Sequence, residues 1–201
     1  MHDLVVLQAA RLKGRLSPDQ AAASGAVGID DATAAVDRLR TDGLLKGETN
    51  VRLTPEGRAR LAELVAEERT SIDAAALSAL YHEFDSHNSE LKSIISDWQM
   101  RAGEPNDHTD AAYDQSVLRR LQELDEGFQP LVSRIIEQAP RLAPYAQRFR
   151  GALEHIAAGD TTYVARPITD SYHTVWFEFH EELIGLLGLS REEEAAAGRA
   201  V

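Results

Sequence analysis

The stretch formed by residues 17–64 constrains this chain most, because its helix and turn signals follow one another closely. Ser17 and Gln20 have the spacing of a capping box, and Pro18 suits the first position of a helix. Gly25 should end this helix early, since glycine is unfavourable inside a helix. A short helix and a tight turn are therefore expected.

A second helix, a small hairpin and a third helix should follow. The second helix is predicted over residues 30–42. Residues 44–46 and 51–53 should form two short strands, because a turn-forming Gly-Glu-Thr-Asn separates them. Thr54 should cap the third helix, with Pro55 at its first position.

Two segments of this stretch resemble the MarR-like winged helix-turn-helix regulators. Residues 39–45, Leu-Arg-Thr-Asp-Gly-Leu-Leu, are similar to the end of a recognition helix that runs into the wing. Residues 53–58, Leu-Thr-Pro-Glu-Gly-Arg, are similar to the far end of the wing. The resemblance covers residues 2–70 and implies DNA binding, with residues 30–40 offered to the major groove. The candidate DNA contacts on this helix and wing are Thr33, Arg38, Arg40, Lys46 and Arg52.

The front of the second helix departs from the usual chemistry of DNA recognition. Asp30 and Asp31 begin it, and no Lys or Arg stands before Arg38. Carboxylates face phosphates badly, although an Asp can accept from cytosine and also stabilises a helix N-terminus. The alternative is a winged helix that serves as a protein-interaction module and does not bind DNA.

Charge is distributed unevenly along the chain, whose formal net charge is −12. Residues 1–70 carry 10 Lys and Arg against 11 Asp and Glu, whereas residues 71–201 carry 11 against 22. A near-neutral DNA-binding part beside an acidic body is physically reasonable. The negatively charged DNA would repel the acidic body, and this repulsion would keep the DNA-binding part oriented toward the duplex.

The composition narrows the cellular compartment in which the protein is expected and the kinds of functional site that it can contain. Apolar residues make up 43% of the chain, which supports a core, and cysteine is absent. The lack of cysteine excludes disulfides, thiolate metal sites and cysteine nucleophiles. The start has no signal-peptide pattern, and no apolar run approaches the ~20 residues of a membrane span. We expect a cytoplasmic protein with no membrane partner.

The chain after residue 70 is predicted to fold as a second, all-α domain. Its apolar residues recur at helical spacing, and loops rich in Gly, Pro and Asp separate them. The expected fold class is mainly α, with a winged helix and its two-stranded wing in residues 1–70 and a helical bundle in residues 71–201.

Local signals predict where the helices of the second domain start, bend and end. Ser71 can cap the first of them, and Asp170 or Thr169 can cap the last long one. The other expected features are a loop at 103–110, a bend or break at Gly127 and Pro130, a loop or extended segment at 161–169, and a short terminal helix from Ser190.

Two of these helices, at 77–98 and 170–187, carry polar residues in otherwise apolar stripes. An unpaired buried polar group costs roughly 1–3 kcal/mol, so these residues should pair or bind something. We expect an effector pocket between the helices, with Arg166 able to attract an acidic group of the ligand. The predicted lining is His87, Asn88, Trp98, Arg166, Tyr172, His173, Trp176 and His180. The alternative is that each histidine is a core or boundary residue satisfied by a carboxylate.

Signals for metal binding and catalysis are weaker. His173 and His180 would lie roughly 10.5 Å apart along a helix, which is long for two ligands of one zinc ion. The chain has no His-Glu-x-x-His sequence, nucleophile elbow, phosphate loop or dinucleotide fingerprint. We therefore expect no metal, no cofactor and no enzyme activity, and a helical metalloenzyme is the least favoured alternative.

The pattern as a whole predicts a ligand-responsive transcription regulator. Residues 1–70 would bind duplex DNA, and residues 71–201 would bind a small-molecule effector. Operators are commonly bound by dimers whose two-fold symmetry matches two half-sites. We expect a homodimer formed mostly through residues 71–201, because the helix at 170–187 is long and apolar.

Overall fold

The computed structural model describes residues 2–25 and 27–190, which are mainly helical and include small two-stranded sheets. The mainly helical class predicted from the sequence is confirmed. The chain divides into two compact units. The first comprises the residues up to Ile72 together with Ala143–Tyr145, and the second comprises Asp73–Leu142 together with the residues from Ala146 on.

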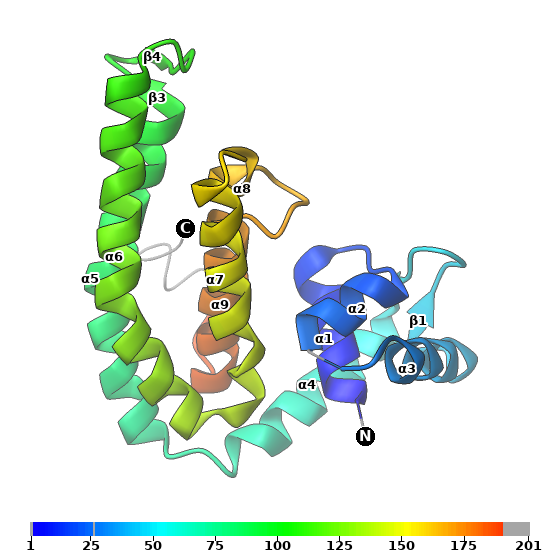
Figure 1. Cartoon of the computed structure of the whole chain (residues 1–201). Coiled ribbons are helices and arrows are strands. Elements are labelled where there is room, and N and C mark those ends of the chain that lie inside the picture. The colour runs from blue at the N-terminus through cyan, green and yellow to red at the C-terminus, as the bar shows by residue number, and fades with distance from the viewer. Residues whose placement is uncertain (1, 26, 191–201) are drawn as a thin grey trace. The chain divides into compact units, whose positions relative to one another are not determined.

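The described part of the first unit combines helices with one short hairpin (Figure 1). Its elements in chain order are α1 (Asp3–Lys13), α2 (Pro18–Gly25), α3 (Ile29–Thr41), β1 (Leu45–Lys46), β2 (Arg52–Leu53) and α4 (Pro55–Arg69). α1 packs against the three other helices of the unit. The predicted helices and strands of residues 17–64 are present with bounds close to those expected.

Side-chain caps start α2 and α4 where the sequence predicts. The Ser17 N–H donates to Gln20 Oε1 at 3.0 Å, and the Gln20 N–H donates to Ser17 Oγ at 3.2 Å, which forms the capping box. At α4 the Gly57 N–H donates to Thr54 Oγ1 at 3.0 Å. The Thr54 hydroxyl donates to Gly43 O at 2.7 Å, so one residue both caps α4 and ties it to the turn after α3.

The β1–β2 hairpin takes its register from its apolar side chains. Leu45 pairs with Leu53, and both side chains are buried. Lys46 pairs with Arg52, and both side chains are exposed. Because side chains alternate between the two faces of a strand, a shift by one residue would expose the leucines and bury the cations.

Two long-range contacts attach the hairpin to the rest of the unit. Leu16, just before α2, exchanges both backbone hydrogen bonds with Val51 at 2.9 Å, and both side chains are fully buried. The second contact is between α4 and the start of the hairpin. A Cβ at Gly57 would clash with the Leu44 carbonyl oxygen, so only glycine allows α4 to pack this closely against Leu44. The bridge to Leu16 was not expected, because a single pair of residues leaves no periodic pattern in the sequence.

The second unit is built on two long helices, α5 and α6, which run side by side (Figure 1). Its elements are α5 (Ala74–Gln99), β3 (Met100–Arg101), β4 (Glu104–Pro105), α6 (Ala111–Gln138), the 3-10 helix η1 (Pro140–Leu142), α7 (Pro144–Ala157), α8 (Thr162–Ala165) and α9 (Tyr172–Leu187). α9 packs against α5 and α8.

The break that was one of the two outcomes expected at Gly127 and Pro130 is absent, because α6 continues through both residues, while the bend stays a prediction. Proline removes one intrahelical hydrogen bond, and here its ring lies on the exposed side of the helix. The buried face on either side of it, which includes Phe128 and Leu131, packs well enough to keep the helix continuous.

Two short elements in the second unit differ from the prediction: a hairpin corrects the all-α expectation, and a one-turn helix replaces part of an expected loop. A hairpin joins α5 to α6, with Met100 opposite Pro105. Its turn residues Ala102 and Gly103 have φ of 51° and 88°, as a tight two-residue hairpin turn requires. The segment 161–169, expected to be a loop or extended, contains the one-turn helix α8. Such short elements have too few residues to show a helical or strand period.

The caps of α5 and α9 also differ from those expected. Asp73, and not Ser71, caps α5 by accepting from the Ala75 and Ala76 N–H groups, both at 3.0 Å. Ser171 caps α9 by accepting from the Thr174 N–H at 3.3 Å, in place of Asp170 or Thr169. The terminal helix predicted from Ser190 lies outside the described residues.

Within residues 2–25 and 27–190, no helix combines the length and the apolar character that crossing a membrane would need.

Candidate functional site

Three of the predicted DNA contacts lie on α3, and each already bonds within the unit. The Arg38 guanidinium bonds to Asp3 of α1, and Arg40 Nη1 lies 3.2 Å from Asp37 Oδ1. The Thr33 hydroxyl donates back to the Ile29 carbonyl of its own helix at 2.8 Å. These three side chains would have to exchange partners to contact a nucleic acid.

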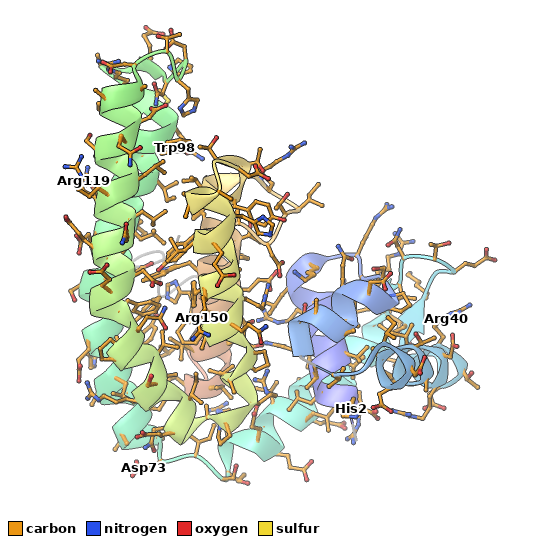
Figure 2. All side chains as sticks on the ribbon, in the orientation of Figure 1. His2, Arg40, Asp73, Trp98, Arg119 and Arg150 are labelled. Carbon is orange, nitrogen blue, oxygen red and sulfur yellow. The ribbon has the colours of Figure 1, made fainter. Side chains whose placement is uncertain are left out.

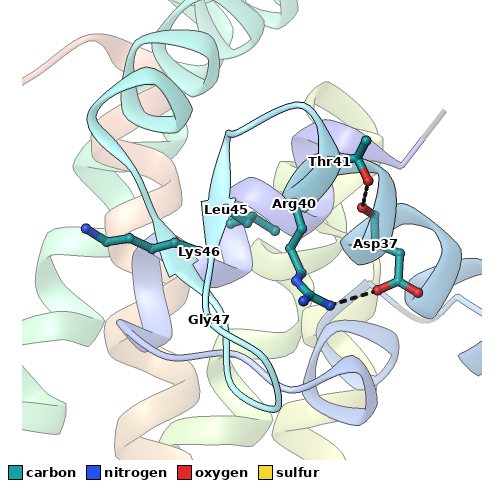
Figure 3. Close-up of a pocket in the computed structure, with 6 residues that line it drawn as sticks. All are labelled: Asp37, Arg40, Thr41, Leu45, Lys46 and Gly47. Carbon is teal, nitrogen blue, oxygen red and sulfur yellow. Dashed lines mark hydrogen bonds and ion pairs between the residues drawn. The ribbon is translucent and has the colours of Figure 1, made fainter.

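A surface hollow of about 530 Å³ lies between the end of α3 and β1 (Figure 3). It is lined by Asp37, Arg40, Thr41, Leu45, Lys46 and Gly47. Figure 3 shows the Lys46 side chain pointing away from Arg40. The two predicted cations therefore do not converge on one point of the hollow.

The hairpin carries its cations in a different arrangement. Lys46 and Arg52 are directly opposite each other and exposed. Leu16 forms an isolated antiparallel bridge with Val51, which brings the exposed Arg15, the residue before Leu16, beside the hairpin. We call the three exposed cations Lys46, Arg52 and Arg15 the cationic row. Among the residues that the structure describes, no carboxylate pairs with any of the three side chains.

The cationic row is not explained by the stability of the hairpin. Like charges directly opposite each other on a sheet are destabilising. Arg15 was not among the predicted contacts, because only the tertiary bridge at Leu16 brings it beside the hairpin. Lys46 and Arg52 were predicted from their position in the expected wing.

The front of α3 offers no cations. Asp30 and Asp31 are exposed, and Gly28 provides no side-chain cap at this N-terminus. Carboxylates in the first turn of a helix interact favourably with the helix dipole. This end of α3 is therefore acidic, whereas the hairpin is basic.

Four of the eight predicted ligand residues lie in the interior of the second unit. Asn88, Tyr172, Trp176 and His180 are each at most 2% exposed. Trp176 Nε1 donates to Asn88 Oδ1 at 3.0 Å, and the Tyr172 hydroxyl donates to Asp125 Oδ1 at 2.9 Å. Burial raises the pKa of Asp125 above its usual value, although this hydrogen bond acts in the opposite direction.

Aromatic rings surround these polar pairs. His180 Nε2 lies within hydrogen-bond distance of the Tyr81 hydroxyl, at 2.8 Å. The Trp176 ring lies 4.3 Å from the Phe128 ring and 5.1 Å from the Phe84 ring, measured between centroids. His180 thus lies inside a packed core with a tyrosine hydroxyl as one of its partners.

The two remaining predicted histidines occupy boundary positions. His87 is half-buried, with its ring 5.5 Å from the Phe128 ring. His173 is also half-buried, and burial lowers its pKa.

Trp98 and Arg166 lie elsewhere in the second unit, on the lining of another surface hollow. Asn88 and Trp98 are ten positions apart on α5, or roughly 15 Å along the helix axis. The structure therefore does not gather His87, Asn88, Trp98, Arg166, Tyr172, His173, Trp176 and His180 into one pocket, and that expectation is corrected. The helical pattern showed which positions were polar, but the pairs that satisfy them come from helices far apart in sequence.

Within the described residues, no group of three or more His, Asp or Glu side chains is arranged to hold a metal ion. No family model, curated protein or solved structure matches the chain.

Proposed function

We propose that the protein is a transcription regulator that binds duplex DNA with its first unit, in the manner of the MarR-like winged-helix proteins that residues 2–70 resemble. In this proposal α3 enters the major groove and the β1–β2 hairpin is the wing that lies along the phosphate backbone. The second unit supplies a helical body that binds a small-molecule effector and forms a homodimer.

The observation that supports the proposal most is the cationic row. Its three positive side chains are exposed on or beside the hairpin, and because they lack carboxylate partners in the described structure they are suited to a polyanion. Phosphate contacts of this kind supply much of the affinity for DNA and orient the protein on the duplex. The leucines behind Lys46 and Arg52 hold the row on the outer face of the hairpin.

A second candidate function follows from the front of α3. Asp30 and Asp31 are exposed where a recognition helix would approach the groove. If α3 does not enter DNA, the first unit is an interaction module whose acidic helix front and basic hairpin bind another protein.

The test is binding of the full chain to a labelled duplex from the region upstream of its own gene, measured by fluorescence anisotropy over a series of salt concentrations. The proposal expects binding at low salt that weakens steeply as salt rises. Arg52→Gln should reduce the slope of log K against log salt by about one, for one lost phosphate contact. Arg119→Gln on α6 is the matched control, since Arg119 is also exposed, and it should leave the slope unchanged.

Absence of binding at low salt would overturn DNA binding and favour the interaction module. Light scattering at micromolar concentration tests the dimer separately, and a monomeric mass would contradict that part of the proposal.

A further inference from the structure

Helix α3 begins with an exposed side chain that neither packing nor helix formation explains. Ile29 is the first residue of α3, and its side chain is the only large apolar one in the described part of the first unit that is exposed, at 46%. Isoleucine is a poorer helix former than alanine, lysine or glutamate. The stability of the unit therefore gives no reason for an isoleucine at this position.

A second apolar group lies one turn further along α3. Thr33 is four residues after Ile29, so the two side chains share one side of the helix. The Thr33 hydroxyl already donates to the Ile29 carbonyl oxygen at 2.8 Å. A polar contact with a ligand would break this bond, whereas an apolar contact through the Thr33 methyl group would keep it. Ala34, the next residue, adds a third exposed apolar side chain.

The same two turns lack the side chains that recognise purines. Arg and Lys form two hydrogen bonds with guanine, and Asn and Gln form two with adenine. Residues 29–37 contain none of these four residue types. Arg38 and Arg40 follow, but they bond to Asp3 and Asp37. Arg40, labelled in Figure 2, belongs to the other end of α3.

Asp30 and Asp31 restrict how the front of α3 can approach a duplex. Both are exposed, and phosphates repel their carboxylates. An aspartate can accept a hydrogen bond from cytosine, but this pair also interacts favourably with the helix dipole, which explains it without a ligand. The front of α3 therefore suits the base edges of the groove better than the backbone, and its apolar groups are the ones without a structural explanation.

One base-edge group in the major groove is apolar. Thymine presents its C5-methyl group there, and apolar side chains contact it. The N-terminal residues of a recognition helix are the ones that approach base edges. We propose that α3 recognises thymine, with Ile29 in contact with the C5-methyl group of one thymine and the Thr33 methyl group in contact with a second. This rests on the proposed function, in which α3 enters the major groove, and adds the base and the residues that give the binding its sequence preference.

The experiment starts from duplexes that the full chain selects at low salt from a pool of random sequences. In a selected duplex each thymine is replaced in turn by deoxyuridine, which lacks the C5-methyl group but keeps every hydrogen-bonding group. Affinity is measured by fluorescence anisotropy. At one or two positions the uracil form should bind about fourfold more weakly, the loss that corresponds to one methyl-sized apolar group.

The variant Ile29→Ala assigns the contact to its residue. It should fold, because the position is exposed and alanine is the better helix former. It should bind the thymine duplex about as weakly as the parent binds the uracil form. One of the sensitive positions should then tolerate uracil without further loss, because the contact is already absent. The salt slope should equal that of the parent, since no phosphate contact is lost.

The matched control is Ile168→Ala. Ile168 is also an exposed isoleucine, at 94%, but it belongs to the second unit. This variant should leave every thymine position as sensitive as it is in the parent.

Two results would overturn the inference and leave DNA binding in place. One is salt-dependent binding with no position at which uracil weakens it. The other is a loss at every uracil position that is the same in Ile29→Ala as in the parent, which would place the methyl contacts on other residues. A pool that yields no bound duplex at low salt would instead contradict the proposed function, and this inference with it.

Discussion

In the first unit the charged side chains lie outside an aliphatic core, whereas in the second unit several of them lie inside an aromatic one. The buried core of the first unit consists of Ala, Val and Leu, and its buried polar residues, Gln8 and Thr54, are uncharged. In the second unit Asp125, Glu178 and Glu182 are buried. A buried carboxylate must find partners, whereas an exposed cation is free to meet a ligand.

Because of this difference, substitutions in the two units should affect different properties of the protein. Substitutions of inward polar groups in the second unit should change the free energy of unfolding, because each has a partner that would be left buried. Substitutions in the cationic row should change binding to polyanions and leave stability almost unaffected. Single variants in each unit test this expectation, beginning with the one that should change stability most.

The largest change in the free energy of unfolding is expected from Arg141→Met. Arg141 donates both terminal nitrogens to Glu182, at 2.9 and 2.8 Å, and the two side chains are 14% and 4% exposed. Losing the arginine weakens the pairing of a buried carboxylate, which should reduce the unfolding free energy by about 3 kcal/mol. The measurement is urea unfolding followed by circular dichroism.

The control for Arg141 is Arg134→Met. Arg134 donates to Glu83 with the same two-bond geometry, at 2.7 and 2.8 Å, but this pair is about half exposed. Exposed pairs contribute little, so stability should hardly change. Equal losses in the two variants would show that burial does not decide the effect.

The next effect is expected from Asn88→Leu, which removes the acceptor of the buried Trp176 N–H. We expect a loss of about 1–3 kcal/mol, the usual consequence of leaving a buried donor unsatisfied. The double variant with Trp176→Phe should lose less than the sum of the two single variants, because neither partner then remains. Strict additivity would mean that the hydrogen bond does not couple the two residues.

A smaller change, in this case a gain in stability, is expected from Asp125→Asn. Burial raises the pKa of Asp125 in the folded state, so the ionised carboxyl disfavours folding once the pH rises above the unfolded value of 3.8. An asparagine oxygen can still accept from Gln129 and Tyr172, which both bond to Asp125 Oδ1. The variant should therefore be more stable than the parent at pH 7.

The pH dependence checks the cause in the Asp125 variant. The difference from the parent should shrink as the pH falls through the folded pKa and vanish below 3.8, where both states are protonated. A difference that stays constant with pH would locate the effect in packing and not in ionisation.

The smallest effect is expected in the first unit, from Arg52→Gln. Relieving the repulsion between Arg52 and Lys46, which lie directly opposite each other, should raise stability by ~0.3 kcal/mol at low salt. The gain should fade as salt screens the charges. A clear loss of stability would mean that the cationic row has a structural role and would weaken the separation between the two units.

Sequence patterns predicted much of the fold because local signals dominate its elements. Ser17 with Gln20, and Thr54 with Pro55, each place a helix start within four residues of chain, so no distant contact is needed to recognise them. The break considered at Pro130 is absent, because packing on the opposite face of α6 outweighs the local preference. Reasoning from local signals failed at β3–β4, whose two-residue strands carry no period.

The candidate sites were only partly predictable. The polar interruptions at Asn88 and His180 were correctly recognised as unusual, but their partners Trp176 and Tyr81 come from helices about 90 to 100 residues away. The sequence alone therefore could not distinguish a satisfied core pair from a pocket lining. Trp98 and Arg166 do line one hollow together, although without the other predicted residues.

Local patterns in the sequence were enough to predict the mainly helical class, the helix starts of the first unit and its short hairpin. They also place the aromatic core in the second unit, since the five Tyr, five Phe and two Trp all follow residue 80. Contacts between distant segments, in contrast, bring Arg15 beside the hairpin and the His108 ring against Trp98. Helix capping and the alternation of side chains in a strand involve residues that are close in sequence, so a local pattern reveals them. The positions of Arg15 and His108 depend instead on the Leu16–Val51 bridge and on a loop in which His108 has a positive φ.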